Sequence, residues 1–153
     1  MAKTKLNAAT EELVRIDADK HPAFTRLWQN TDFSRIRENN FPAFKQIEGL
    51  SLLCLVDDPN MYKETFDMIV IGPEIAKLFG DTLSAKGFTD PSFGRTIATM
   101  LGIHRLPAIA IFRNGEMMGA IEGLKNWTEY EQELVAILTR DNAPKKTIAI
   151  SAR

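Results

Sequence analysis

The chain has 153 residues, of which 44% are hydrophobic and 25% are charged, a composition typical of one ordinary globular domain. Its 19 Lys and Arg residues against 20 Asp and Glu residues give a net charge of -1, so the basic excess that a nucleic-acid backbone requires is missing. Cys54 is the single cysteine, which excludes an internal disulfide and a CxxC redox pair.

The composition along the chain predicts one domain with two extensions. Residues 1–20 are polar and rich in alanine, and we interpret them as an N-terminal extension of uncertain order. Residues 21–140 hold every periodic apolar pattern and form the expected domain. Residues 141–153 are interpreted as a flexible C-terminal tail.

Two short helices are expected before the first central strand. Pro22 can occupy the first position of a helix, where its missing N–H costs nothing, and apolar residues follow with helical spacing at 24–28. A brief edge segment at 33–36 comes next. Asn39 or Asn40 can then cap a second amphipathic helix.

The middle of the chain predicts a buried strand, a helix and a weaker strand. Leu50–Val56 is apolar at nearly every position, which fits a central strand covered on both faces. Met68–Phe79 keeps helical spacing of apolar residues, so we expect a helix kinked near Pro73 and ended by Gly80. A weaker strand is expected at 82–88.

The next pattern predicts a helix and then a hairpin. Asp90 and Pro91 are typical of an N-cap and a first helical residue, for a helix running to about residue 101. Ala108–Phe112 is a second apolar strand. Asn114-Gly115 after it is the strongest short signal for a hairpin, whose second strand would cover Met117–Ile121.

A last helix is expected at the C-terminal end of the domain. Thr128 and Glu131 have the spacing of a capping box, and the apolar residues from 130 to 138 would form the buried face. From residue 50 onward the expected order is therefore βαβαββα. Parallel strands bridged by helices and closed by a hairpin indicate an α/β fold with a central mixed β-sheet flanked by helices.

Neither a metal nor another cofactor is expected, because His21 and His104 have no cysteine or second histidine at ligand spacing. The apolar runs are far shorter than the roughly 18 residues that a membrane-spanning helix needs. Lys3 and Lys5 are followed by polar residues where a signal peptide would have its apolar stretch. We therefore expect a cytoplasmic protein without a membrane span.

The segment Gly102–Glu116 carries a resemblance to a known fold. It is similar to the thioredoxin segment in which a cis-proline opens the strand before the hairpin, and Pro107 stands at that position. A proline fits there because the strand starts at it and loses no ladder hydrogen bond. The resemblance implies a thioredoxin-like fold with a cis Leu106–Pro107 bond before the C-terminal hairpin.

The redox pair of thioredoxins has no counterpart in this sequence. Counting back from Pro73, the two cysteine positions fall near Thr65 and Met68, and neither residue can form a mixed disulfide. Cys54 lies inside an apolar strand, where a buried hydrophobe is favoured over a reactive thiolate. A thiol redox enzyme that uses Cys54 alone remains the alternative from the enzyme class.

Motifs over about residues 21–139 resemble the HyaE/HupG family of thioredoxin-like accessory proteins for uptake [NiFe] hydrogenases. The motifs are His21-Pro22 with Arg26-Leu27, Asp58-Pro59 with Glu64, Gly72-Pro73-Glu74, Leu106-Pro107, and the segment from Gly119 to Trp127. The resemblance implies a non-catalytic chaperone that binds the hydrogenase small subunit, whose precursor bears a twin-arginine export signal. Other hydrogenase accessory proteins are further expected partners. A generic thioredoxin-like scaffold for another assembly pathway is a further alternative.

Two groups of residues are candidates for partner binding. The first is acidic, with Lys63 as the nearest base along the chain: Asp57, Asp58, Glu64 and Asp67. Carboxylates accept forked hydrogen bonds from guanidinium groups, so this group suits a twin-arginine segment. The alternative interpretation is a solvated acidic loop in which Asp58 caps a turn.

The second group surrounds the proline that opens the second apolar strand. In the resembling fold, the residue before the cis-proline offers backbone groups to an extended peptide, and here that residue is Leu106. Strand addition of this kind gives affinity without sequence-specific chemistry. We therefore expect His104, Arg105, Leu106 and Pro107 to form a docking edge, with His104 in a structural or contact role.

Overall fold

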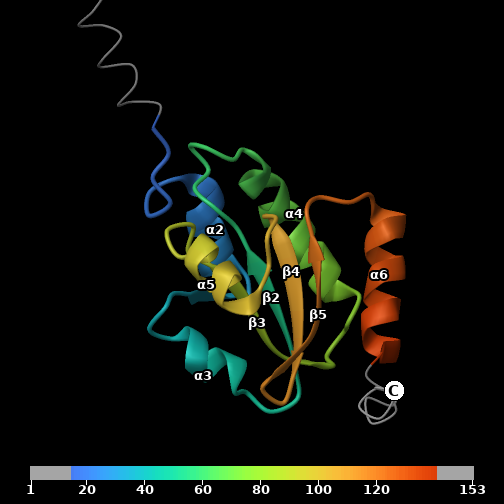
Figure 1. Ribbon diagram of the computed structural model, residues 1–153. Coiled ribbons are helices and arrows are strands. Elements are labelled where there is room, and N and C mark those ends of the chain that lie inside the picture. Colours follow the sequence, from blue (N-terminus) through green and yellow to red (C-terminus); the bar gives the residue numbers. More distant parts are fainter. Residues whose placement is uncertain (1–14, 141–153) are drawn as a thin grey trace, which may run out of the picture.

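The computed structural model describes residues 15–140, which form a five-stranded sheet between two layers of helices (Figure 1). The expected extension at residues 1–14 and the tail at 141–153 lie outside the described residues. In chain order the elements are α2 (Pro22–Asn30), β1 (Ser34–Ile36), α3 (Phe41–Lys45), β2 (Leu50–Leu55), α4 (Glu64–Lys77), β3 (Leu83–Thr89), α5 (Gly94–Leu101), β4 (Ala108–Arg113), β5 (Glu116–Glu122) and α6 (Trp127–Arg140).

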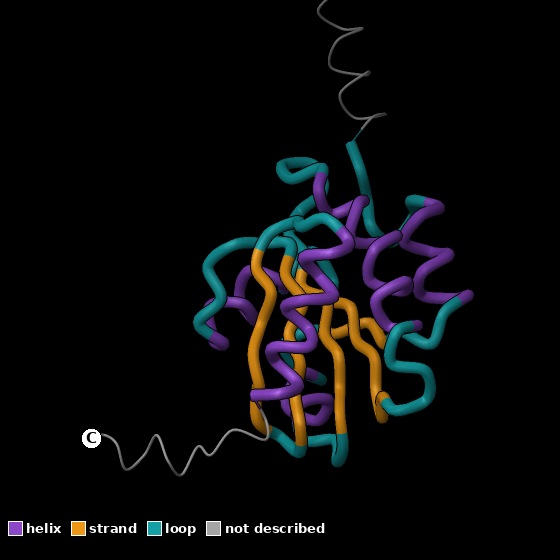
Figure 2. Tube along the Cα trace, turned by 90° about the vertical axis from the view of Figure 1, so that its right-hand side faces the viewer, coloured by secondary structure: helices purple, strands orange, loops and turns teal. Residues whose placement is uncertain are grey.

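The sheet has the strand order β1-β3-β2-β4-β5 and is mixed, as the sequence predicts. Figure 2 shows its strands side by side. Strands β1, β3 and β2 run parallel, whereas β4 is antiparallel to both β2 and β5. Leu55, the last residue of β2, pairs with Ala108, the first residue of β4. The carboxyl ends of β1, β2 and β3 therefore lie on the same side of the sheet as the start of β4. We call this side, where the parallel strands end, the site edge.

Strand β2 is buried on both faces, which confirms the expectation for this apolar run. Leu52 and Cys54 belong to one core cluster, which packs against α2, α4 and α6. Leu53 and Leu55 belong to a second cluster, which packs against α3 and α5. Because each face of the strand has its own core, apolar residues are needed at every position and not at alternate ones.

The hairpin between β4 and β5 also forms where the sequence predicts it. Asn114 and Gly115 have φ angles of 50° and 91°, the left-handed conformation that the tight turn requires. The side-chain oxygen of Asn114 accepts a hydrogen bond from the backbone N–H of Gly49 at 2.6 Å. The turn thereby also holds the chain that enters β2.

Two helix starts differ from their predicted positions. Helix α4 begins at Glu64 and not at Met68, because its first turn exposes acidic residues and the apolar periodicity starts only where the helix reaches the core. The prediction that Thr128 and Glu131 form a capping box is wrong. At the start of α6, Asn126 and Glu129 instead exchange backbone-to-side-chain hydrogen bonds of 2.9 and 3.0 Å.

Two residues that were expected to cap helices make different contacts. Asp90 does not stand at the N-cap position of α5, because a turn over residues 91–93 comes before the helix begins at Gly94. Its carboxylate caps that turn by accepting the N–H of Ser92, and it also forms an ion pair with Arg35. Asn40 stands at the N-cap position of α3, yet its side chain does not cap the helix. Its side-chain oxygen accepts the N–H of Arg37 and its amide donates to the carbonyl of residue 35.

We predict that Gly94→Ala destabilises the fold severely. A Cβ atom at this position would lie 1.7 Å from the carbonyl oxygen of Val56, so α5 would have to move away from β2. We expect a loss of at least about 3 kcal/mol in the free energy of unfolding, measured by urea denaturation.

Gly80→Ala is the matched control, because no atom lies within 4 Å of its added Cβ although φ is +59°. It should cost only about 1–2 kcal/mol, the strain of a left-handed residue with a side chain. Equal losses in the two variants would contradict the proposed contact between α5 and β2.

Candidate functional site

The site edge brings together the loop after β2 and the segment before β4. Pro107 immediately precedes Ala108, the partner of Leu55, and therefore lies beside the end of β2. The Leu106–Pro107 peptide bond is cis, which confirms that expectation. Pro107 is buried, Leu106 is half-buried, and His104 and Arg105 are exposed. The two predicted groups of partner-binding residues are thus neighbours in the fold.

The positions of the missing redox pair carry no reactive group. Thr65 is buried in the first turn of α4 and donates its hydroxyl to the carbonyl oxygen of Asp57 at 2.7 Å. Met68 is fully buried. Cys54 has no exposed surface, and its burial raises the pKa of the thiol far above the ordinary range. Within residues 15–140 the edge therefore has no thiolate for disulfide exchange.

The partner of Asp57 is Arg95 in α5 and not Lys63, the nearest base along the chain. Nε and Nη2 of Arg95 each lie 3.0 Å from Oδ2 of Asp57. Nη1 of the same guanidinium donates to the carbonyl oxygen of His104 at 3.3 Å, and Tyr62 lies below it with its ring centre 5.9 Å away. Arg95 thus links the loop after β2 to the segment before β4.

The other acidic residues of the predicted group divide into two kinds. Oδ1 of Asp58 accepts hydrogen bonds from both the backbone and the side-chain nitrogen of Asn60 at 3.0 Å, so Asp58 organises a turn. Glu64 and Asp67 are exposed on the first turn of α4 and make no ion pair within residues 15–140. Their negative charge is stabilised there by the N-terminal end of the helix dipole.

Glu122 in β5 fixes the segment before the cis-proline. Its Oε1 accepts the backbone N–H groups of His104 and Arg105 at 2.8 and 2.9 Å. Desolvation opposes the charge of this carboxylate, but the two N–H donors prevail and lower its pKa. Leu106 itself makes no backbone hydrogen bond to any of the described residues.

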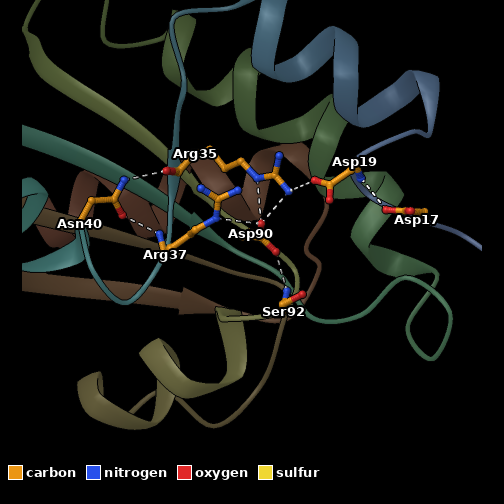
Figure 3. A network of polar contacts seen from close by, with 7 residues as sticks. All are labelled: Asp17, Asp19, Arg35, Arg37, Asn40, Asp90 and Ser92. Carbon is orange, nitrogen blue, oxygen red and sulfur yellow. Dashed lines mark hydrogen bonds and ion pairs between the residues drawn. The ribbon is translucent and has the colours of Figure 1, made fainter.

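A cluster of charges lies at the ends of β1 and β3 (Figure 3). Nε and Nη2 of Arg35 lie 2.8 and 2.7 Å from Oδ2 of Asp90, and Nε of Arg37 lies 3.4 Å from the same oxygen. Burial tends to raise the pKa of Asp90, but the N–H of Ser92 and the guanidinium of Arg35 lower it overall. Nη2 of Arg35 also binds Oδ1 of Asp19 at 2.5 Å.

These charges line an open polar cleft with a volume of about 1040 Å³. The loop after β2 forms one wall through Asp57, Asp58 and Asn60, and residues 15–21 form another. No cluster of three or more His, Cys, Asp and Glu side chains suited to a metal ion occurs between residues 15 and 140. No helix in the same part of the chain is long and apolar enough to cross a membrane.

Sequence reasoning missed Arg95, Glu122, Arg35 and Asn60, all of which hold the site edge together. Arg95 and Glu122 are 38 and 18 residues from the groups that they bind, Asp57 and the N–H of His104. No local pattern marks such pairs, because each forms only after the strands have assembled. The predicted antiparallel pairing of the two hairpin strands was the one signal in the sequence that could have located such a contact.

The fold and the site define a thioredoxin-like domain without a dithiol at the edge where thioredoxins carry theirs. A family model described as Hydrogenase-1 expression protein HyaE matches residues 23–130. The chain therefore belongs to the HyaE family. This confirms the family that the sequence motifs resemble.

Individual relatives agree with the family match. The chain is 24% identical over 107 residues to the hydrogenase expression/formation protein HupG of Bradyrhizobium diazoefficiens, with 67% of this chain and 69% of that protein covered. It is 22% identical to the hydrogenase expression/formation protein HoxO of Cupriavidus necator, with coverage of 84% and 81%. A protein of the same name from Azotobacter vinelandii is also 22% identical, with 80% and 81% covered.

We predict a pH-dependent cost for Asp90→Asn. The folded-state pKa of Asp90 lies below the ordinary value of 3.8, so its ion pairs stabilise the fold fully above that value and are lost as pH falls through the folded-state pKa. At neutral pH the variant should lose about 2 kcal/mol in the free energy of unfolding, because the buried carboxylate pairs with arginine. In urea denaturation the difference from the parent protein should shrink below pH 3.8.

Asp32→Asn provides the control, because Asp32 is 85% exposed and lies 3.5 Å from Lys86. It should cost at most about 0.5 kcal/mol at any pH. A cost for Asp90→Asn that stayed the same from neutral to acid pH would disprove the role of its charge.

Proposed function

We propose that this protein is a non-catalytic assembly factor in the maturation of an uptake [NiFe] hydrogenase. In this proposal it binds the precursor of the hydrogenase small subunit in the cytoplasm, before export, by way of the twin-arginine signal peptide. Other hydrogenase accessory proteins are further partners. The family match and the names of the relatives support the hydrogenase role.

The observation that carries the proposal is the pair of exposed carboxylates on the first turn of α4. Glu64 and Asp67 form no ion pair within residues 15–140, whereas Asp57 is paired with Arg95 and Asp58 is engaged by Asn60. Two acidic groups at successive positions of one helix face match two adjacent guanidinium groups, which form forked hydrogen bonds with carboxylates. We assign the arginine-binding role to Glu64 and Asp67, with Asp57 and Asp58 shaping the loop beside them.

The backbone of Leu106 supplies the second contact. Because Glu122 holds the two preceding N–H groups, Leu106 presents its own N–H and carbonyl in a fixed position. An extended peptide can add to these groups as a strand adds to a sheet edge. His104 and Arg105 are exposed beside this position, and the buried ring of Pro107 supports it. The signal peptide would then lie along Leu106, with its arginines toward α4.

The absence of a reactive thiol at the edge supports a binding role over a redox role. In a thioredoxin-like fold, a peptide that reaches the cis-proline edge is placed beside the residues at the start of α4. Here those residues are Thr65 and Met68, both of which are buried. A bound peptide would therefore meet a surface that holds it without chemical attack.

We predict that Glu64→Gln combined with Asp67→Asn weakens binding of a signal peptide that contains two adjacent arginines. The loss should be about threefold to tenfold, because exposed ion pairs contribute modestly. Fluorescence anisotropy with a labelled peptide measures the affinity. Binding to the parent protein should also weaken as salt is raised, since the charges are exposed.

The double variant Glu48→Gln with Asp81→Asn is the matched control. Both residues are exposed and precede β2 and β3, at the opposite edge of the sheet, so the charge change is equal and the site is untouched. This control should bind the peptide as the parent does. Equal affinity of the two double variants would remove Glu64 and Asp67 from the proposed site.

We predict that Cys54 of the folded protein does not react with a maleimide. Its sulfur is fully buried and its pKa is raised by burial, so the thiolate forms only when the chain opens. Labelling followed by mass spectrometry should be rapid in urea and should be limited by unfolding without it. Rapid labelling of the native protein would favour the alternative of a thiol enzyme that uses Cys54.

A further inference from the structure

An apolar stripe runs along one face of α6, the helix at the margin of the molecule (Figure 1). Trp127 and Val135 are 41% and 62% exposed, and their separation of eight residues places them on the same helix face, with Glu131 between them. Leu124 in the loop before α6 is also exposed and extends the stripe toward the site edge. Contiguous exposed apolar side chains mark binding surfaces, whereas single ones do not.

The stripe continues into an apolar pocket between α6 and the end of α4, with a volume of about 420 Å³. The apolar lining of the pocket comes from both sides: Leu78, Phe79, Leu134, Val135 and Leu138. Within residues 15–140, Glu131 is the one charged residue of this lining, and its Oε2 accepts a hydrogen bond from Nε1 of Trp127 at 3.1 Å. Because this contact joins the pocket to the stripe, we treat the pocket with Leu124 and Trp127 as one surface, the α6 groove.

The near end of the α6 groove meets the site edge. The N–H of Gly123 donates to the carbonyl oxygen of Pro107 at 2.9 Å, so Leu124 follows directly on a residue that is bound to the cis-proline segment. Burial raises the pKa of Tyr130 in α6, and the negative charge of Asp67 raises it further, because the starts of α4 and α6 lie close together. The surface is therefore acidic at one end and apolar along the rest of its length.

We propose that the α6 groove binds the apolar stretch that follows the arginines of an export signal peptide, an inference that rests on the proposed function. Signal peptides carry basic residues before an apolar stretch of roughly 7–15 residues. This order matches the surface, in which Glu64 and Asp67 come before the apolar groove. The peptide would pass from Leu106 to Leu124 and then along α6.

The length of the α6 groove agrees with this occupant. From Trp127 to Leu138 the helix rises by about 16 Å, at about 1.5 Å for each residue. A second helix of about eleven apolar residues has the same length and lies within the range of a signal peptide. An apolar helix that lies in a groove between two helices is a common mode of peptide recognition.

Two labelled synthetic peptides test the proposal by fluorescence anisotropy with the full chain. Both carry two adjacent arginines; the apolar peptide continues with about eleven leucine and alanine residues, and the serine peptide has serine in place of each leucine. The parent protein should bind the apolar peptide at least about tenfold more tightly, because buried leucine side chains add to the affinity. The apolar peptide alone should shift the tryptophan emission to shorter wavelength, and this shift should disappear in Trp127→Phe, since Trp127 is partly exposed in the free protein.

Val135→Asn tests the groove itself. It should weaken binding of the apolar peptide about threefold to tenfold and leave binding of the serine peptide unchanged. The variant should fold, because Val135 is exposed and valine and asparagine have similar helix propensities. Met100→Asn is the control, since Met100 is also exposed but lies in α5, on the other face of the sheet. It should bind both peptides as the parent does.

The two peptides also separate this proposal from the proposed function. Glu64→Gln with Asp67→Asn should weaken binding of both peptides by the same factor, because the arginines are common to them. Equal affinity of the parent for the two peptides, or of Val135→Asn and Met100→Asn for the apolar peptide, would overturn the role of the α6 groove and leave the arginine site intact. Failure of both peptides to bind would overturn the proposed function as well. Self-association of the parent that is lost in Val135→Asn, with peptide binding unchanged, would assign the groove to a second copy of the chain and overturn the proposal.

Discussion

The burial of β2 on both faces is the constraint on which the other parts of the structure depend. Leu52 and Cys54 face the core beneath α2, α4 and α6, and Leu53 and Leu55 face the core beneath α3 and α5. A strand of this kind must lie in the middle of the sheet, with parallel β3 on one side and antiparallel β4 on the other. That arrangement alone places the end of β2 beside the cis-proline at the start of β4.

The chemistry of the site edge follows from how its charges are shared. Arg95 neutralises Asp57, Glu122 binds two backbone N–H groups, and Asp90 lies between Arg35 and Arg37. Each of these groups is held by partners from another part of the chain, so it shapes the edge more than it attracts ligands. Glu64 and Asp67 differ, because the described part of the chain gives them no ion pair. Charges left exposed in this way cost the fold little stability.

The cis-proline geometry of the fold is present here without a dithiol beside it. The bond before Pro107 is cis, the backbone of Leu106 makes no hydrogen bond to the described residues, and Thr65 and Met68 are buried at the start of α4.

The layered α/β fold could be predicted from the sequence alone, because the patterns behind it are local. The unbroken apolar run of β2, the Asn114-Gly115 turn and the spacing of apolar residues in the helices each depend on neighbours along the chain. The family motifs likewise located the proline edge and the acidic loop. Which carboxylates are neutralised depends on contacts that form only when the chain folds. The contacts of Arg95 with Asp57 and of Arg35 with Asp19 join separate parts of the chain. They can therefore contribute to stability only after the sheet has brought those parts together.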